Sequence, residues 1–162
     1  MRQRRNPLPF LCPTANTVPT AEGAIQLAME NMPITIHACR ALVIGYGRVG
    51  RLLADRLRGL GAFVSVAARR YEQLAWAEAD GCTVQRLGDM GGWLCGYDLI
   101  VNTVPARVLT EELLSDLKAS CLVIDVASKP GGADVGMGLW EKGSKCEKSE
   151  RTRNVYLSGH GI

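Results

Sequence analysis

The stretch ALVIGYGRVGRLLADRLRGLGAFVSVAARR, residues 41–70, contains an apolar run, a glycine-rich turn, a helical pattern and a second apolar run. Apolar residues from Val49 to Leu60 recur at helical spacing, and the helical segment ends at Gly61. The two flanking runs are short and rich in strand-forming residues. Strand, turn, helix and strand in this order predict a parallel βαβ unit.

The glycines of the turn have the G-x-G-x-x-G spacing of a dinucleotide-binding segment. In such a segment Gly45 would allow a tight turn, Gly47 would let backbone amides approach a pyrophosphate, and Gly50 would let the helix pack closely. The helix N-terminus offers free N–H groups and a partial positive charge. The alternative is that the glycines only shape a turn. We predict cofactor contacts at Gly45, Tyr46, Gly47, Arg48, Val49 and Gly50.

The residue that selects the nucleotide is expected about 20 residues after the glycines, at the end of the second strand. An acid there would bind a ribose hydroxyl, but this chain has Ala67, Ala68, Arg69 and Arg70, and the nearest carboxylate downstream is Glu72. An arginine can pair with a 2′-phosphate through its fork of donors. We therefore predict NADP(H), with Arg69 and Arg70 on the phosphate. The alternatives are NAD(H), or arginines that are merely solvated.

Strands and helices alternate along the rest of the chain. A helix at 20–31 should end before Pro33, and the turn-helix unit of residues 41–70 follows it. The later pattern predicts a helix at 71–81, strands at 82–87 and 97–105, a helix at 110–118 and a strand at 121–127. This alternation is typical of an α/β fold, a Rossmann-like doubly wound parallel sheet with helices on both faces.

We expect a single domain. Residues 19–134 form the dinucleotide-binding unit, residues 1–18 form an irregular leader, and residues 135–162, which alternate glycine with charge, form a poorly ordered tail.

Two other segments should face the cofactor, because ligands of doubly wound sheets lie outside the carboxyl ends of the strands. After the fifth strand, Ser128, Lys129 and Gly131 should emerge near the nicotinamide end, where Lys129 would hold a carboxylate substrate. The alternative for Lys129 is a surface lysine beside a turn. The fourth strand ends in a segment for which we predict cofactor contacts at Asn102, Thr103, Val104 and Pro105. The alternative for this segment is an ordinary strand-to-helix turn.

The composition is that of a globular protein. The 162 residues are 47% hydrophobic and 22% charged, with a net charge of +3, and this balance excludes a strongly basic nucleic-acid-binding class. No apolar stretch reaches the roughly 20 residues of a membrane span. Six cysteines lack C-x-x-C spacing, so we expect neither a metal site nor a redox pair, and we expect most of these residues to be small core residues or unreactive thiols. We expect a cytoplasmic protein that binds neither nucleic acid nor membrane.

Four segments resemble, in this order, the nucleotide-binding domain in the A subunit of dipicolinate synthase: NTVPTAEGAIQLAMEN, residues 41–70, VNTVPARVL and LVIDVASKPGGAD. The combination of PTAEGA with SKPGG is far more specific than the glycine turn, which many dehydrogenases share. The resemblance covers about residues 16–134. It implies oxidation of a dihydrodipicolinate-type dicarboxylate to dipicolinate in sporulating bacteria, with a pyridine nucleotide as oxidant and the B subunit of dipicolinate synthase as partner.

The chain also departs from the pattern of that family. The resemblance implies an N-terminal domain before the PTAEGA helix and a further C-terminal helix, and we expect this chain to lack both. Thr20 and Glu22 of the linker helix are expected near the substrate, with helix capping as the alternative for Thr20. No catalytic residue is assigned, and His37 is expected to be structural.

Two other functions remain open. One is a non-catalytic truncated nucleotide-binding remnant, and the other is a different NAD(P)-dependent dehydrogenase domain. In either case the chain could form a homo-oligomer.

Overall fold

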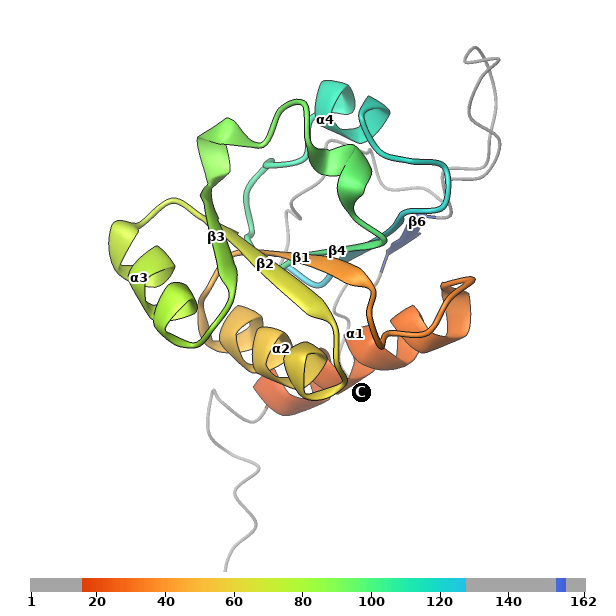
Figure 1. Ribbon diagram of the computed structural model, residues 1–162, viewed down its shortest axis with the longest axis horizontal. Helices are drawn as coiled ribbons and strands as arrows, with labels where there is room; N and C mark the ends of the chain where they lie inside the picture. Colours follow the sequence, from red (N-terminus) through yellow and green to blue (C-terminus); the bar gives the residue numbers. More distant parts are fainter. Residues whose placement is uncertain (1–15, 128–153, 157–162) are drawn as a thin grey trace, which may run out of the picture.

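The computed structural model describes residues 16–127 and the strand 154–156. Its strands form one sheet in the order β3-β2-β1-β4-β5-β6, and every neighbouring pair is parallel (Figure 1). The strands are β1 (Arg40–Ile44), β2 (Phe63–Ala68), β3 (Thr83–Arg86), β4 (Leu99–Asn102), β5 (Leu122–Asp125) and β6 (Asn154–Tyr156). The predicted α/β, Rossmann-like doubly wound sheet is confirmed, because the chain returns from the β3 edge to the far side of β1.

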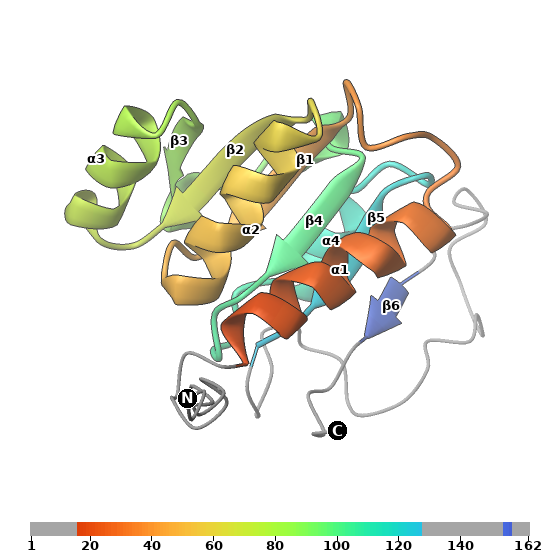
Figure 2. The same cartoon turned by 90° about the horizontal axis from the view of Figure 1, so that it is seen from below.

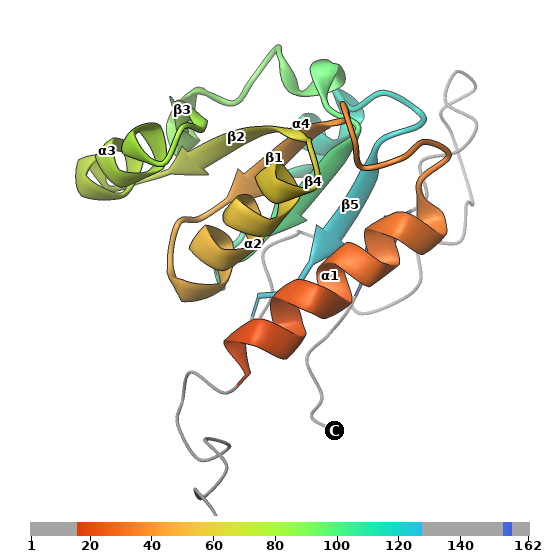
Figure 3. The same ribbon diagram turned by 60° about the horizontal axis from the view of Figure 1, so that its bottom comes forward.

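Helices cover both faces of this sheet (Figures 2 and 3). One face carries α1 (Thr17–Asn31), α2 (Arg48–Gly59) and α3 (Tyr71–Ala79). The other carries the short helices η1 (Leu87–Asp89), η2 (Leu94–Gly96) and α4 (Glu111–Ser115). Right-handed crossovers explain this division, because the direction of travel across the sheet reverses after β3.

The central strand β1 shows why these runs are almost continuously apolar. Ala41 and Val43 belong to the core on the side of α1 and α2, whereas Leu42 and Ile44 belong to the core on the opposite side. All four are fully buried. Successive side chains of a strand point to opposite faces, so a strand covered on both faces is apolar at every position.

Helix α1 begins three residues before its predicted start. Pro19 lies in its first turn, where the missing N–H has no intrahelical partner in any case. The helix ends at Asn31, as predicted. It buries Ala21, Ala24 and Ala28, whose small side chains let it lie close to α2 and the sheet.

Three other segments differ from their predicted extents. Strand β4 is shorter than expected because the side chain of Asn102 accepts a hydrogen bond from the Val104 amide and turns the chain there. Helix α4 covers only part of 110–118, although Thr110 caps it as a good N-terminal residue should. Residues 154–156, within the segment 135–162 that we predicted to be a poorly ordered tail, form β6, which pairs with β5; the other residues of that segment lie outside the described ranges.

A polar cluster joins the strands at their amino ends. Asp98 accepts a hydrogen bond of 2.8 Å from the Arg40 amide and pairs with Lys118. Burial opposes ionisation of Asp98, but these two donors outweigh it and hold its pKa below the usual value. Nearby, burial raises the pKa of the Cys39 thiol to about 11 and that of Cys121 to about 12. Both thiols are buried core residues, as predicted, and a raised pKa disfavours the reactive thiolate form.

Candidate functional site

The glycine turn joins β1 to α2 at the carboxyl edge of the sheet. Gly45 has a φ of +93°, and a Cβ there would lie 2.6 Å from Thr103 Oγ1 and 2.7 Å from Val104 Cγ2. Its amide donates to the Ala67 carbonyl of β2 at 2.8 Å. Both the left-handed backbone and the close approach therefore require glycine.

The other two glycines of the turn have different surroundings. A Cβ at Gly50 would clash with the Gly45 carbonyl oxygen, so only glycine lets α2 pack on the turn. Gly47 has an ordinary φ of −83°, and a Cβ there would meet no atom of the described residues within 4 Å. Packing within the described part of the chain therefore requires Gly45 and Gly50 but leaves open space at Gly47.

The first turn of α2 borders this open space. No described residue accepts a hydrogen bond from the amides of Arg48, Val49 or Gly50, and the first backbone bond of the helix runs from Arg51 to Gly47. Gly47 is the N-cap and brings no capping side chain. Free amides and the positive end of the helix dipole suit a phosphate group. The turn thus fits the pyrophosphate of a dinucleotide.

Tyr46 points away from this space. Its side chain is 7% exposed and donates a hydrogen bond of 2.8 Å to Asp80 Oδ2, while Arg51 pairs with the same oxygen at 3.1 Å. Burial, together with this hydrogen bond, raises the pKa of Tyr46 above its usual value, and the tyrosine hydroxyl with Arg51 lowers the pKa of Asp80. The side chain of Tyr46 anchors the turn to α3, so a cofactor contact at this position is open to its backbone alone.

The polar residues at the ends of β4 and β5 also bond to one another. Asn102, which is fully buried, donates to the Val104 carbonyl at 3.0 Å and to Asp125 Oδ1 at 3.1 Å. The Thr103 hydroxyl donates to the Ile44 carbonyl at 2.8 Å. These bonds occupy both amide protons of Asn102 and the single proton of Thr103. The structure places Asn102 and Thr103 at the carboxyl edge of the sheet, with their side-chain donors already used.

The two arginines that should select the nucleotide lie at the end of β2. Ala67 and Ala68 are buried, whereas Arg69 and Arg70 are exposed in the turn before α3. Neither arginine pairs with a carboxylate of a described residue. Within the described part of the chain, both guanidinium groups are thus available to an external anion.

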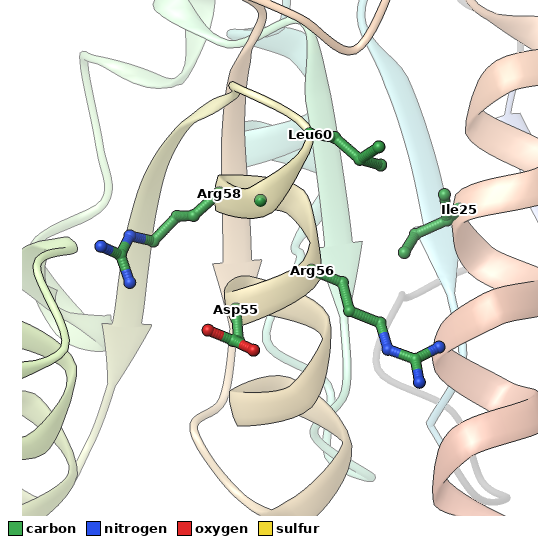
Figure 4. A pocket seen from close by; sticks show the side chains of 6 residues that line it. Ile25, Asp55, Arg56, Arg58 and Leu60 are labelled. Atoms are coloured by element: carbon green, nitrogen blue, oxygen red, sulfur yellow. The ribbon is translucent and has the colours of Figure 1, made fainter.

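Two of the residues predicted to lie near a substrate, Thr20 and Glu22, bond to other residues of the chain. The Thr20 hydroxyl donates to the Asn16 carbonyl at 2.5 Å, and Glu22 pairs with Arg56 of α2 at 2.6 Å. Figure 4 shows Arg56 reaching across a shallow groove between α2 and α1, which Ile25 and Leu60 also line. Residues Ser128, Lys129 and Gly131 lie outside the described residues.

His37 lies in the loop before β1, against Gly61 in the turn after α2. A Cβ at Gly61 would clash with its Nδ1 atom, so His37 supports the turn after α2. No group of three or more potential metal ligands gathers within residues 16–127. No helix in the described ranges is both long and apolar enough to cross a membrane.

No pattern along the chain points to the Tyr46–Asp80–Arg51 cluster, because these residues come from three different elements. The sequence contains a weak signal for the hydrogen bond between Asn102 and Asp125, because each of these polar residues ends an otherwise apolar run.

Comparisons with known proteins agree with this geometry. Residues 17–128 match the family described as "D-isomer specific 2-hydroxyacid dehydrogenase, NAD binding domain". The A subunit of dipicolinate synthase from Bacillus subtilis (strain 168) is 35% identical over 119 residues, which are 74% of this chain and 40% of the relative. Alanine dehydrogenase of Halomonas elongata is 27% identical over 132 residues, which are 73% of this chain and 34% of the relative.

Solved structures show the same relationship. The A subunit of dipicolinate synthase from Bacillus halodurans is 39% identical, with a TM-score of 0.72 over 75% of this chain and 42% of that structure. A transhydrogenase from Sinorhizobium meliloti, 20% identical, shares the fold with a TM-score of 0.68 over 75% of this chain and 42% of that one. The chain spans about 40% of the length of the curated dipicolinate synthase subunit that it matches. It is homologous to that subunit over this span, and it belongs to the NAD-binding domain family of D-isomer specific 2-hydroxyacid dehydrogenases.

Proposed function

We propose that this chain is the NADP(H)-binding domain of an oxidoreductase that resembles the A subunit of dipicolinate synthase. The observation that carries the proposal is the open space at Gly47 beside the free amides of α2, next to two glycines that the fold itself requires. A turn that served packing alone would have no need of glycine at this middle position. The identity to the A subunit of dipicolinate synthase, 35% over 119 residues, supports the same assignment.

The preference for the phosphorylated cofactor rests on the end of β2. The two positions before the turn are buried alanines, and Arg69 and Arg70 follow with no carboxylate partner among the described residues. A ribose hydroxyl would find no acceptor of the usual kind there, whereas a 2′-phosphate would find two guanidinium groups. The predicted contacts at the turn and at residues 102–105 complete the proposed cofactor site.

The proposed reaction is oxidation of a dihydrodipicolinate-type dicarboxylate to dipicolinate during sporulation. A bound oxidised nicotinamide would supply the hydride acceptor for this two-electron oxidation, and the proton lost from the substrate ring would pass to water. The substrate contacts proposed are Lys129 with Ser128 and Gly131, and, from α1, Thr20 and Glu22. Because Glu22 pairs with Arg56, its carboxylate would have to exchange that partner. We also propose the B subunit of dipicolinate synthase as the partner and the cytoplasm as the location.

Titration of the purified full chain with NADPH and NADH, followed by nicotinamide fluorescence, tests the proposal after circular dichroism has shown a folded protein. We expect both nucleotides to bind and NADPH to bind more tightly. Tighter NADH binding would refute the NADP assignment. A folded chain that binds neither would refute the cofactor-binding function and favour a non-catalytic remnant. Dipicolinate formation with the B subunit would then separate this reaction from that of another dehydrogenase.

A further inference from the structure

A third arginine lies beside the pair that follows β2. Arg86 is the last residue of β3 and is in register with Ala68, the last residue of β2. Neighbouring strands are about 4.8 Å apart. The end of β3 at Arg86 therefore lies next to the end of β2, which Arg69 follows. Arg86 is exposed, and no carboxylate of a described residue pairs with it.

The side chain of Arg86 is held by an aromatic ring. Its guanidinium carbon lies 4.9 Å from the centroid of Tyr71, the first residue of α3. Tyr71 is 68% exposed and Arg86 is also exposed, so this contact lies at the surface of the protein. Stacking uses the flat face of an arginine and leaves the N–H groups of its edge free for an anion. The ring therefore orients Arg86 without using its donors.

The local charge argues for an anionic ligand. Arg69, Arg70 and Arg86 lie around the carboxyl ends of two adjacent strands. Two acids are nearby in sequence, Glu72 on the first turn of α3 and Asp89 at the end of η1, and within the described residues neither pairs with an arginine of this group. Like charges gathered in this way repel one another, and a dianion between them relieves the repulsion. In a doubly wound sheet the adenosine ribose lies at the end of β2. The group that reaches these arginines is therefore the one attached to that ribose.

We infer that Arg86, oriented by Tyr71, is a specificity-determining residue that contacts the 2′-phosphate of the adenosine together with Arg69 and Arg70. The inference rests on the proposed cofactor-binding function. It assigns the discrimination between NADPH and NADH to the edge formed by β2 and β3, and not to the two arginines after β2 alone. If Arg86 instead contacted the face of the adenine ring, its substitution would weaken the binding of NADPH and NADH equally.

The test measures dissociation constants of the full chain for NADPH and NADH by nicotinamide fluorescence, and for 2′,5′-ADP by calorimetry. We expect Arg86→Ala to weaken the binding of NADPH and 2′,5′-ADP by about 10-fold, which corresponds to the loss of one charged hydrogen bond. The binding of NADH should weaken by less than about 2-fold. Tyr71→Phe keeps the ring and should leave all three constants unchanged. Tyr71→Ala should weaken NADPH several-fold, because the guanidinium is no longer held.

Arg58→Ala is the matched control, because it removes the same charge from an exposed position on the last turn of α2. It should leave the preference for NADPH unchanged. If Arg86→Ala weakens both nucleotides equally, or neither, while the wild type prefers NADPH, the inference is wrong and the proposed function stands. If the wild type prefers NADH, the inference and the NADP assignment both fail. A folded wild-type chain that binds neither nucleotide refutes the inference and the proposed function together.

Discussion

Substitution of Gly47 separates its role in ligand binding from its role in folding. A Cβ at Gly47 would meet no described atom within 4 Å, and the φ of −83° is one that alanine adopts readily. Alanine lowers the entropy of the unfolded chain, which stabilises by about 0.4–1 kcal/mol, and it is a poorer N-cap than glycine by a similar amount. The two effects should nearly cancel, so we expect Gly47→Ala to change the free energy of unfolding by less than about 1 kcal/mol.

The effect of Gly47→Ala on binding should be much larger. Phosphate oxygens accept hydrogen bonds from backbone amides at about 2.9 Å, and the added methyl group would occupy the space through which they approach. Loss of one charged hydrogen bond, about 1.5–3 kcal/mol, corresponds to a loss of affinity of roughly 10-fold to 100-fold for NADPH and NADH alike.

Two further glycine variants calibrate this result. Gly50→Ala would place its Cβ against the Gly45 carbonyl oxygen, and we expect it to lower the free energy of unfolding by about 2–3 kcal/mol, as overpacking does. Gly59→Ala, at the other end of α2, meets no described atom within 4 Å and should raise stability by up to about 1 kcal/mol with unchanged binding. Urea unfolding followed by circular dichroism and fluorescence titration measure the two quantities. A Gly47→Ala protein that is as stable as the wild type and binds both nucleotides as tightly would refute our reasoning about the open space.

Three further predictions concern the supports of the site. Tyr46→Phe should lower the free energy of unfolding by about 1 kcal/mol through loss of its bond to Asp80; urea unfolding measures this, and an unchanged midpoint would contradict it. Because the pKa of Asp98 is lowered in the folded protein, the contribution of Asp98 to stability is present above its unfolded pKa and is lost as the pH falls through the folded value. Asp98→Asn should therefore flatten the acid side of the plot of unfolding free energy against pH. A plot identical to that of the wild type would contradict the proposed contribution of the Asp98 cluster. Iodoacetamide at neutral pH should label the exposed Cys95 but spare Cys121 in the native protein, as peptide mass spectrometry would report; rapid labelling of Cys121 would show that it is not buried.

The sequence predicted the fold well because periodicity and the glycine spacing agree locally. The apolar runs, the helical spacing and the breaks at Gly61 and Gly81 each depend on neighbouring residues, and the strand order follows from crossover handedness. The start of α1 was placed late because Pro19 suits several positions of a first turn. The strand β6 was not expected, because a segment of three residues carries little periodic signal and its pairing with β5 is a long-range event.

The candidate site was predicted less completely. The turn and the arginines could be predicted because the roles proposed for them depend on spacing along the chain. The direction of the Tyr46 side chain could not, since its partner Asp80 follows α3 and only packing brings the two together. Similarly, the sequence placed Asn102 at the carboxyl end of a strand but could not show that Asp125 and Val104 use its donors.

These internal bonds divide recognition between two regions of the same edge. Tyr46, Asn102 and Thr103 direct their side-chain donors into the chain. In the proposed site, the amides of α2 would therefore bind the pyrophosphate, and the arginines at the ends of β2 and β3 would bind the ribose phosphate. The first region would contact what NADH and NADPH share, and the second would contact what distinguishes them. Substitutions at Gly47 and Arg86 should then have additive effects on the free energy of NADPH binding, because they act on different groups of the ligand and share no protein partner. A strong coupling between them would mean that the two regions move together, and that neither can be assigned to one end of the cofactor.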